Sequence, residues 1–157
     1  VEQHPVEYAE RLAVPLRWWV QGTMLVASLW LATAVALPTV ASWIVTGAAL
    51  ALMTAMLVGY GSARIRVGDG QLTAGRATIG AEHIGDAAPL DPDATRRLAG
   101  PGADARAYLL LRPYLKRAVR VDITDPTDPA PYWLLCTRRP DDLAAALRAL
   151  TADAAAG

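Results

Sequence analysis

The chain has 157 residues, of which 54% are hydrophobic and 19% are charged, and its formal net charge is zero. This length indicates one domain or slightly more, and the balanced charge argues against a general nucleic-acid-binding protein. The single cysteine, Cys136, excludes an intramolecular disulfide, and with only two histidines a Cys/His zinc site is implausible. We therefore expect no metal, no cofactor and no nucleic-acid partner.

A long apolar stretch follows the first basic residues. Residues 18–63 contain no charged residue and no histidine. A helix needs about 20 apolar residues to cross a bilayer, so the stretch is long enough for two crossings. Pro38 and Thr39 divide it, and we predict a transmembrane helical hairpin with spans at about 18–37 and about 40–60. Interfacial aromatic residues mark the proposed ends: Trp18, Trp19, Trp43 and Tyr60.

The basic residues beside the spans predict the orientation. Arg11 and Arg17 precede the first span, Arg64 and Arg66 follow the second, and the turn between the spans has none. The positive-inside rule then places both termini in the cytoplasm and the turn outside the cell (plasma) membrane. A signal peptide cleaved after residues 34–36 is the alternative, but a second span follows that site directly.

Small residues recur at every fourth position of the second span. They are Gly47, Ala51, Ala55 and Gly59, and the first span repeats the spacing with Ser28, Ala32 and Ala36. Such a stripe lets another helix backbone approach closely. It predicts a helix-packing face, either within the hairpin or toward a partner, although an alanine-rich chain also produces such stripes by chance.

The chain thus divides into a cytoplasmic N-terminal segment (1–17), the transmembrane hairpin (18–63) and a cytoplasmic domain (64–157). Alternation and turn signals in the domain predict six or seven short antiparallel strands, within 64–67, 71–74, 77–79, 82–87, 107–111, 118–124 and 132–136. Gly68-Asp69-Gly70 predicts a hairpin turn. Asp91 as the N-cap and Pro92 after it predict a short helix that ends near Ala99. Pro140 begins a C-terminal amphipathic helix whose predicted buried stripe is Leu143, Leu147 and Leu150. The predicted fold class is a membrane α-helical hairpin plus a small α+β domain. Its element order resembles that of a pleckstrin-homology-like domain.

Short motifs flank the spans. Before them stand Tyr8, Glu10-Arg11-Leu12, Val14-Pro15 and Trp18-Trp19; after them stand Arg112-Pro113, Ala118-Val119, Asp125-Pro126, Asp128-Pro129, Pro131-Tyr132-Trp133 and Thr137-Arg138-Arg139-Pro140. With these motifs, nearly the whole chain resembles an uncharacterised family of small actinobacterial two-span membrane proteins, the domain of unknown function 3093. The resemblance implies an integral membrane protein and brings no assigned activity. Cys136 and Tyr114 depart from the serine and tryptophan of other members.

No catalytic constellation stands out, so we expect no catalytic residues. The only serines lie in or beside the spans: Ser28, Ser42 and Ser62. A lone histidine such as His83 is more often structural than catalytic, and Cys136 ends an apolar strand as a small core residue would. Asp141 and Asp142 form a carboxylate pair, but the first turn of a helix favours negative charge without any catalysis.

The stretch RPYLKRAVRV, residues 112–121, gathers positive charge in a neutral chain. We predict a hairpin with its tip at 113–117. Its basic side chains are Arg112, Lys116, Arg117 and Arg120. They could face only solvent, the anionic lipids of a nearby membrane surface or an acidic protein partner, and the sequence leaves the three open.

The sequence favours an integral membrane protein that is a non-catalytic accessory or interaction subunit of a membrane assembly. The alternative is a membrane-tethered module that recognises anionic lipid headgroups through the basic hairpin. An enzyme is a third alternative, which a buried polar cleft around His83 would favour. The expected partners are the lipid bilayer, a membrane protein and anionic lipid.

Overall fold

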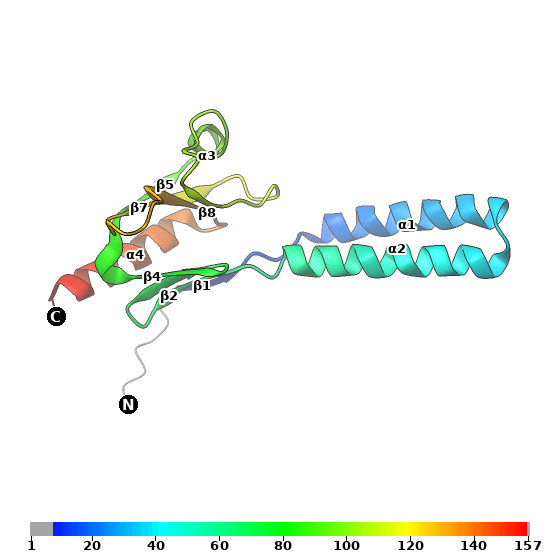
Figure 1. Ribbon diagram of the computed structural model, residues 1–157, viewed down its shortest axis with the longest axis horizontal. Helices are drawn as coiled ribbons and strands as arrows, with labels where there is room; N and C mark the ends of the chain where they lie inside the picture. Colours follow the sequence, from blue (N-terminus) through cyan, green and yellow to red (C-terminus); the bar gives the residue numbers. More distant parts are fainter. Residues whose placement is uncertain (1–7, 157) are drawn as a thin grey trace. The chain divides into compact units, whose positions relative to one another are not determined.

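The computed structural model describes residues 8–156, which form two compact units. One unit, within residues 13–62, is a pair of long helices. The other joins residues 8–12 to residues 63–156 and contains two four-stranded sheets with further helices. Figure 1 shows the elements in chain order.

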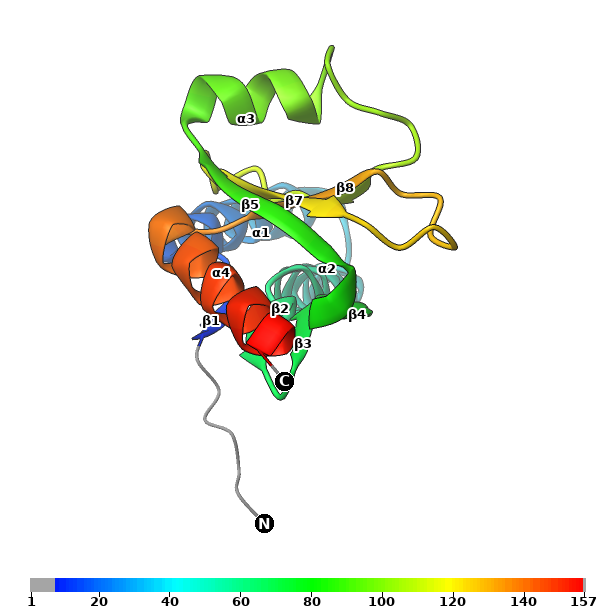
Figure 2. The same ribbon diagram turned by 90° about the vertical axis from the view of Figure 1, so that its left-hand side faces the viewer.

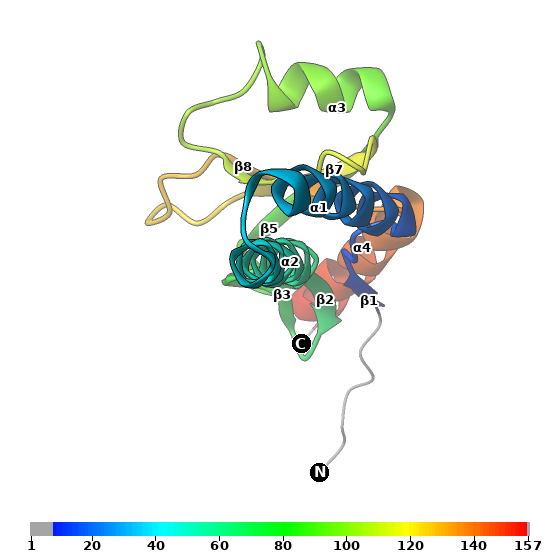
Figure 3. The ribbon, with the colours of Figure 1, turned by 90° about the vertical axis from the view of Figure 1, so that its right-hand side faces the viewer.

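The helical unit is an antiparallel hairpin of α1 (Leu16–Ala36) and α2 (Thr39–Tyr60), seen end-on in Figure 3. The helix break predicted at Pro38 and Thr39 is confirmed, because α1 ends just before Leu37 and α2 starts at Thr39. Near the turn the hydroxyl oxygens of Thr33 and Ser42 lie 2.9 Å apart and join the two helices. Both helices are long and apolar enough to cross a membrane.

The α1–α2 seam depends on a small residue in α1. A Cβ atom added at Gly22 would overlap the Met53 sulfur, so the glycine admits the long side chain of α2. The rings of Trp30 and Trp43 also meet across the hairpin, with their centroids 5.8 Å apart. The seam therefore includes a close approach, an aromatic contact and a polar contact, while most side chains of both helices are exposed.

The first sheet contains β1 (Tyr8–Arg11), β2 (Arg64–Gly68), β3 (Gln71–Ala74) and β4 (Ala77–Gly80), in that order and all antiparallel. The predicted turn between β2 and β3 is confirmed: Asp69 and Gly70 have φ of 54° and 71°, the left-handed values that a tight hairpin turn needs. One expectation is wrong. The segment before the helices is not a separate N-terminal part, because its β1 pairs with β2 and completes the sheet.

The second sheet follows the short helix η1 (Ala81–His83). It contains β5 (Ile84–Leu90), β6 (Tyr108–Leu110), β7 (Ala118–Ile123) and β8 (Tyr132–Cys136), in the order β5-β7-β8-β6. The expectation of antiparallel strands throughout is wrong, because β6 pairs with β8 in parallel. Every residue of β8 is buried, so this strand takes an interior position with a neighbour on each side.

Two helices cover opposite faces of the second sheet. The closing helix α4 (Pro140–Ala156) contacts strands of both sheets, and Figure 2 shows it running alongside them. Its predicted stripe of Leu143, Leu147 and Leu150 is buried in the main core. The short helix α3 (Pro92–Ala99) covers the other face with Leu98 and Ala99. An α+β unit closed by a C-terminal helix is thereby confirmed, whereas the pleckstrin-homology-like analogy stays a prediction.

Candidate interaction site

The predicted basic hairpin does not exist. Residues 111–117 connect β6 to β7, and these two strands are not neighbours, because both pair with β8. The sequence suggested a hairpin because two apolar runs flank a proline-containing basic loop. The central position of β8 separates the two strands, so the four basic side chains do not line one hairpin.

Two of the four basic residues serve the α+β unit itself. Arg120 donates from Nε to Asp122 Oδ1 at 2.8 Å, and its guanidinium lies 4.6 Å from the centroid of the Tyr132 ring. Arg120 and Asp122 are two residues apart in β7 and therefore project from one face of the strand. Arg112 is half-buried and donates from Nη1 to the carbonyl of Leu111 at 2.9 Å. Both cations therefore already have partners within the unit.

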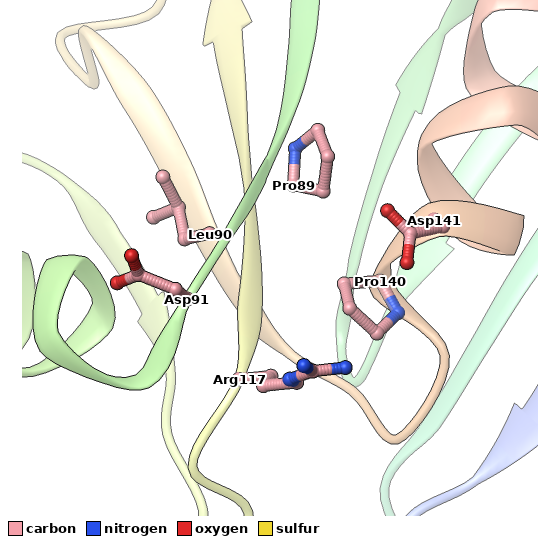
Figure 4. A pocket seen from close by; sticks show the side chains of 6 residues that line it. All are labelled: Pro89, Leu90, Asp91, Arg117, Pro140 and Asp141. Carbon is pink, nitrogen blue, oxygen red and sulfur yellow. The ribbon is translucent and has the colours of Figure 1, made fainter.

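Lys116 and Arg117 are exposed. Arg117 lines a pocket of about 180 Å³, drawn in Figure 4 with Pro89, Leu90, Asp91, Pro140 and Asp141. Asp91 accepts a hydrogen bond from the Ala94 N–H at 2.7 Å and so caps α3, as the sequence predicted. Because two carboxylates accompany one guanidinium, the pocket carries no excess of positive charge for a phosphate. Contact of these basic residues with lipid or a partner stays a prediction.

The candidate chemical groups lie apart from one another. Cys136 is buried, and burial raises the pKa of its thiol although the N–H and charge of Arg112 oppose that shift. Such a thiol is a poor nucleophile near neutral pH. His83 belongs to η1, and its Nε2 atom lies 3.7 Å from Oε1 of Glu82, which is exposed. Among residues 8–156 no group of three or more His, Cys, Asp or Glu side chains could hold a metal ion.

The small-residue stripe of α2 faces away from α1. Gly47, Ala51, Ala55 and Gly59 are exposed, and a Cβ atom added at either glycine would meet no atom within 4 Å. The equivalent residues of α1 are exposed as well: Ser28, Ala32 and Ala36. The prediction that the stripe packs within the hairpin is therefore wrong, because α1 and α2 contact each other through other positions. Of the packing alternatives, a face toward a partner is the one that remains.

A buried polar network, which sequence reasoning missed, joins β1 to the loop between β8 and α4. Its centre is Glu10, whose side chain is only 6% exposed. The Tyr8 hydroxyl donates to Glu10 Oε2 at 2.7 Å, the Thr137 hydroxyl donates to the same oxygen, and the Arg138 N–H donates to Oε1 at 3.0 Å. Three donors satisfy the carboxylate, which would otherwise be costly to bury.

Two arginines of the same loop cover the outer edge of β1. Arg138 donates from Nη1 to the carbonyl of Arg11 at 3.2 Å, and Arg139 donates from Nη2 to the carbonyl of Ala9 at 3.3 Å. The Arg139 guanidinium also lies 5.0 Å from the centroid of the Tyr8 ring. An open strand edge invites pairing with another chain, so these contacts protect the sheet. Both sides of the network come from motifs that flank the helices in the sequence.

The network makes stability depend on pH in the alkaline range. Burial raises the pKa of Tyr8 from 10.0 to about 12; the hydrogen bond with Thr137 opposes the rise and Glu10 adds to it. The folded chain then keeps a proton that the unfolded chain loses above pH 10, so stability falls as the pH rises from 10 to 12. We expect Tyr8→Phe to remove the part of this loss of stability that is due to Tyr8. Urea unfolding of both proteins across that range measures it, and equal slopes for the two would contradict the expectation.

These features define a class of protein: an apolar helical hairpin inserted between the first two strands of an α+β unit that two sheets and a closing helix form. The model of the family described as "Protein of unknown function (DUF3093)" matches residues 7–147, and the chain belongs to this family. The match includes both long helices and all eight strands that the structure describes. No curated protein and no solved structure matches the chain.

Proposed function

We propose that the chain is an integral membrane protein whose α1–α2 hairpin crosses the bilayer. One observation carries the proposal. Among the described residues, every large hydrophobic side chain that is exposed lies between Leu16 and Val58, inside the hairpin. A contiguous apolar surface of this extent is typical of contact with a membrane or a partner, since soluble monomers rarely expose more than a few hundred Å² in one patch.

The apolar surface surrounds both helices instead of forming one stripe. α1 has no buried residue, and the only buried residues of α2 are Ser42 and Leu57. A helix at the surface of a soluble protein has a polar face toward water, whereas a helix in lipid is apolar all round. This pattern supports a hairpin surrounded by lipid. The basic residues near the open end of the hairpin, Arg11, Arg17, Arg64 and Arg66, support an orientation with both termini in the cytoplasm and the turn at Pro38 outside.

We propose further that the protein is a non-catalytic accessory or interaction subunit of a membrane assembly. The stripe of Gly47, Ala51, Ala55 and Gly59 supports this role, because it is exposed and leaves room for a second helix. In lipid, helices associate through close packing at small residues, not through the hydrophobic effect. The partner would then be another membrane protein that contacts α2 on the face opposite to α1.

Purification of the full chain in mild detergent tests the accessory role. We expect a partner protein to co-purify at a fixed stoichiometry. Gly47→Leu or Gly59→Leu should lower the recovery of this partner about tenfold, since the loss of about 1.4 kcal/mol of packing energy weakens a complex tenfold. Either leucine starts from open space, because no atom lies within 4 Å of a Cβ added at Gly47 or Gly59.

Ala48→Leu is the matched control, because it enlarges an exposed residue of α2 that lies off the stripe. This variant should recover the partner like the wild type. A lone monomer in native mass spectrometry, or equal recovery with all three leucine variants, would contradict the accessory role.

A further inference from the structure

Three arginines share the outer face of the first sheet. Arg11 stands directly opposite Arg64 in the β1–β2 pairing, and Arg66 stands opposite Ala9 on one side and Thr73 on the other. Residues that are directly opposite in a sheet project from the same face. All three arginines are exposed. We call this surface, made by Arg11, Arg64 and Arg66, the arginine face.

We propose that the arginine face binds the anionic phospholipid headgroups of the leaflet that α1 and α2 enter. The inference rests on the proposed membrane insertion and adds a ligand class to it. It also differs from the basic-hairpin hypothesis, because none of these arginines belongs to residues 112–121. Three observations carry it: the lack of an ion pair between these arginines and an acid of the described residues, the place of the arginines along the chain and the polar surroundings of Arg66.

The strand residues of the arginine face include no acid, although Asp69 at the β2–β3 turn and Glu82, whose carboxylate lies against Gly80, stand at its margin. Register places these other residues of the four strands on the same face, and all are uncharged: Ala9, Gly68, Gln71, Thr73, Thr78 and Gly80. Within residues 8–156, none of the three arginines forms an ion pair with an acid. Like charges directly opposite in a sheet repel each other, so the Arg11–Arg64 pair has a cost that a bound anion offsets.

The chain holds the arginine face near both helix ends. Residues 12–15 separate Arg11 from α1, and residues 61–63 separate Arg64 from α2. A fully extended chain spans at most about 3.6 Å per residue, so Arg11 and Arg64 lie within about 18 Å and about 14 Å of a helix end. The headgroup region adds several Å beyond the hydrocarbon core, and an arginine side chain reaches several Å further. If the helices cross the bilayer, the two guanidinium groups are within reach of lipid phosphates.

The surroundings of Arg66 are polar and slightly hollowed. Arg66 lines a pocket of about 130 Å³ with Gly68, Asp69, Gln71 and Thr73. The amide of Gln71 and the hydroxyl of Thr73 can hydrogen-bond a headgroup beside a phosphate on Arg66. Asp69, at the β2–β3 turn, lines the same pocket, and its negative charge would repel a bound anion. Removing that charge is therefore an independent test of anion binding. The Arg117 pocket is less suited to phosphate, because two carboxylates line it.

Lipid binding by the full chain tests the proposal. The protein is purified in detergent, and native mass spectrometry measures its affinity for phosphatidylglycerol and for zwitterionic phosphatidylcholine. We expect preference for phosphatidylglycerol, and at least tenfold lower affinity for it after Arg11→Gln/Arg64→Gln/Arg66→Gln, since a basic residue near an anionic surface contributes about fivefold. Added inorganic phosphate should not displace the lipid, because the face is proposed to bind a membrane surface and not a free ion.

Three further variants serve as controls for charge and for stability. Arg96→Gln/Lys116→Gln/Arg117→Gln removes three exposed positive charges elsewhere and should leave the affinity for phosphatidylglycerol unchanged. Asp69→Asn keeps a residue that tolerates the positive φ of 54° and should raise that affinity about twofold to fivefold. Arg64→Gln alone should raise the thermal stability in neutral detergent, because it relieves the repulsion with Arg11.

The outcomes separate this inference from the proposed membrane insertion. Resistance of the triple Gln variant to alkaline extraction from membranes reports on the helices and should match the wild type. If even the wild type is extracted, the membrane proposal fails and the inference fails with it. If the wild type resists extraction but the arginine substitutions leave the affinity for phosphatidylglycerol unchanged, only the inference fails. Loss of a co-purifying acidic protein with unchanged lipid affinity would also overturn it, in favour of a protein partner.

Discussion

Glu10→Ala lowers the free energy of unfolding of the α+β unit by about 3 kcal/mol, because the loss of one partner leaves buried polar groups unsatisfied. Without the carboxylate, the Tyr8 hydroxyl, the Thr137 hydroxyl and the Arg138 N–H lose their common acceptor. Pulse proteolysis of the full chain in detergent, over a series of urea concentrations, measures the change.

Two variants calibrate this expectation. Glu10→Gln keeps the shape and one acceptor oxygen but loses the charge, so its cost should be about 1–2 kcal/mol. Glu82→Ala removes a carboxylate whose side chain is 68% exposed, and it should change stability by less than about 0.5 kcal/mol. A Glu10→Ala protein as stable as Glu82→Ala would show that the network does not hold β1 in the sheet.

Strong local signals predicted much of this fold. The charge-free stretch and Pro38 predicted both long helices to within about two residues of their observed ends. The glycine-containing turn after β2, the Asp91 cap of α3 and the leucine stripe of α4 are also confirmed. Each of these features is encoded by neighbouring residues, since a cap, a turn or an amphipathic stripe is complete within a few turns of chain.

The errors concern features that arise from distant residues. β1 escaped prediction because it is short, one of its two inward side chains is the acid Glu10, and its partner strand lies beyond the whole hairpin. The parallel pairing of β6 with β8 depends on β8 taking the interior position of the sheet, where it is buried on both faces. The residues close to these strands in the sequence do not indicate which strand takes that position. The basic hairpin was wrong for the same reason, because adjacency in sequence was taken for adjacency in the sheet.

The candidate interaction surfaces show the same limit. From the sequence, Arg11, Arg64 and Arg66 indicated orientation, and only the β1–β2 register places them side by side on one face. The contacts among Tyr8, Glu10 and Thr137 likewise require the loop after β8 to reach β1. Motifs on both sides of the helices were visible in the sequence, but their meeting point required the fold.

Membrane topology has the largest expected effect, because accessibility from one side of a bilayer is all or none. The background is Cys136→Ser, which removes the single native cysteine. Into it is placed either Thr39→Cys, at the exposed start of α2 beside the turn, or Ala105→Cys, in an exposed loop of the α+β unit. Each protein is treated with a membrane-impermeant maleimide, first on intact cells and then after permeabilisation.

This labelling tests the central claim most directly. A two-span hairpin with both termini in the cytoplasm predicts that the Thr39→Cys protein is labelled on intact cells and that the Ala105→Cys protein is labelled only after permeabilisation. The reverse pattern would contradict the orientation. Labelling of both positions from the same side of the membrane would contradict the crossing itself.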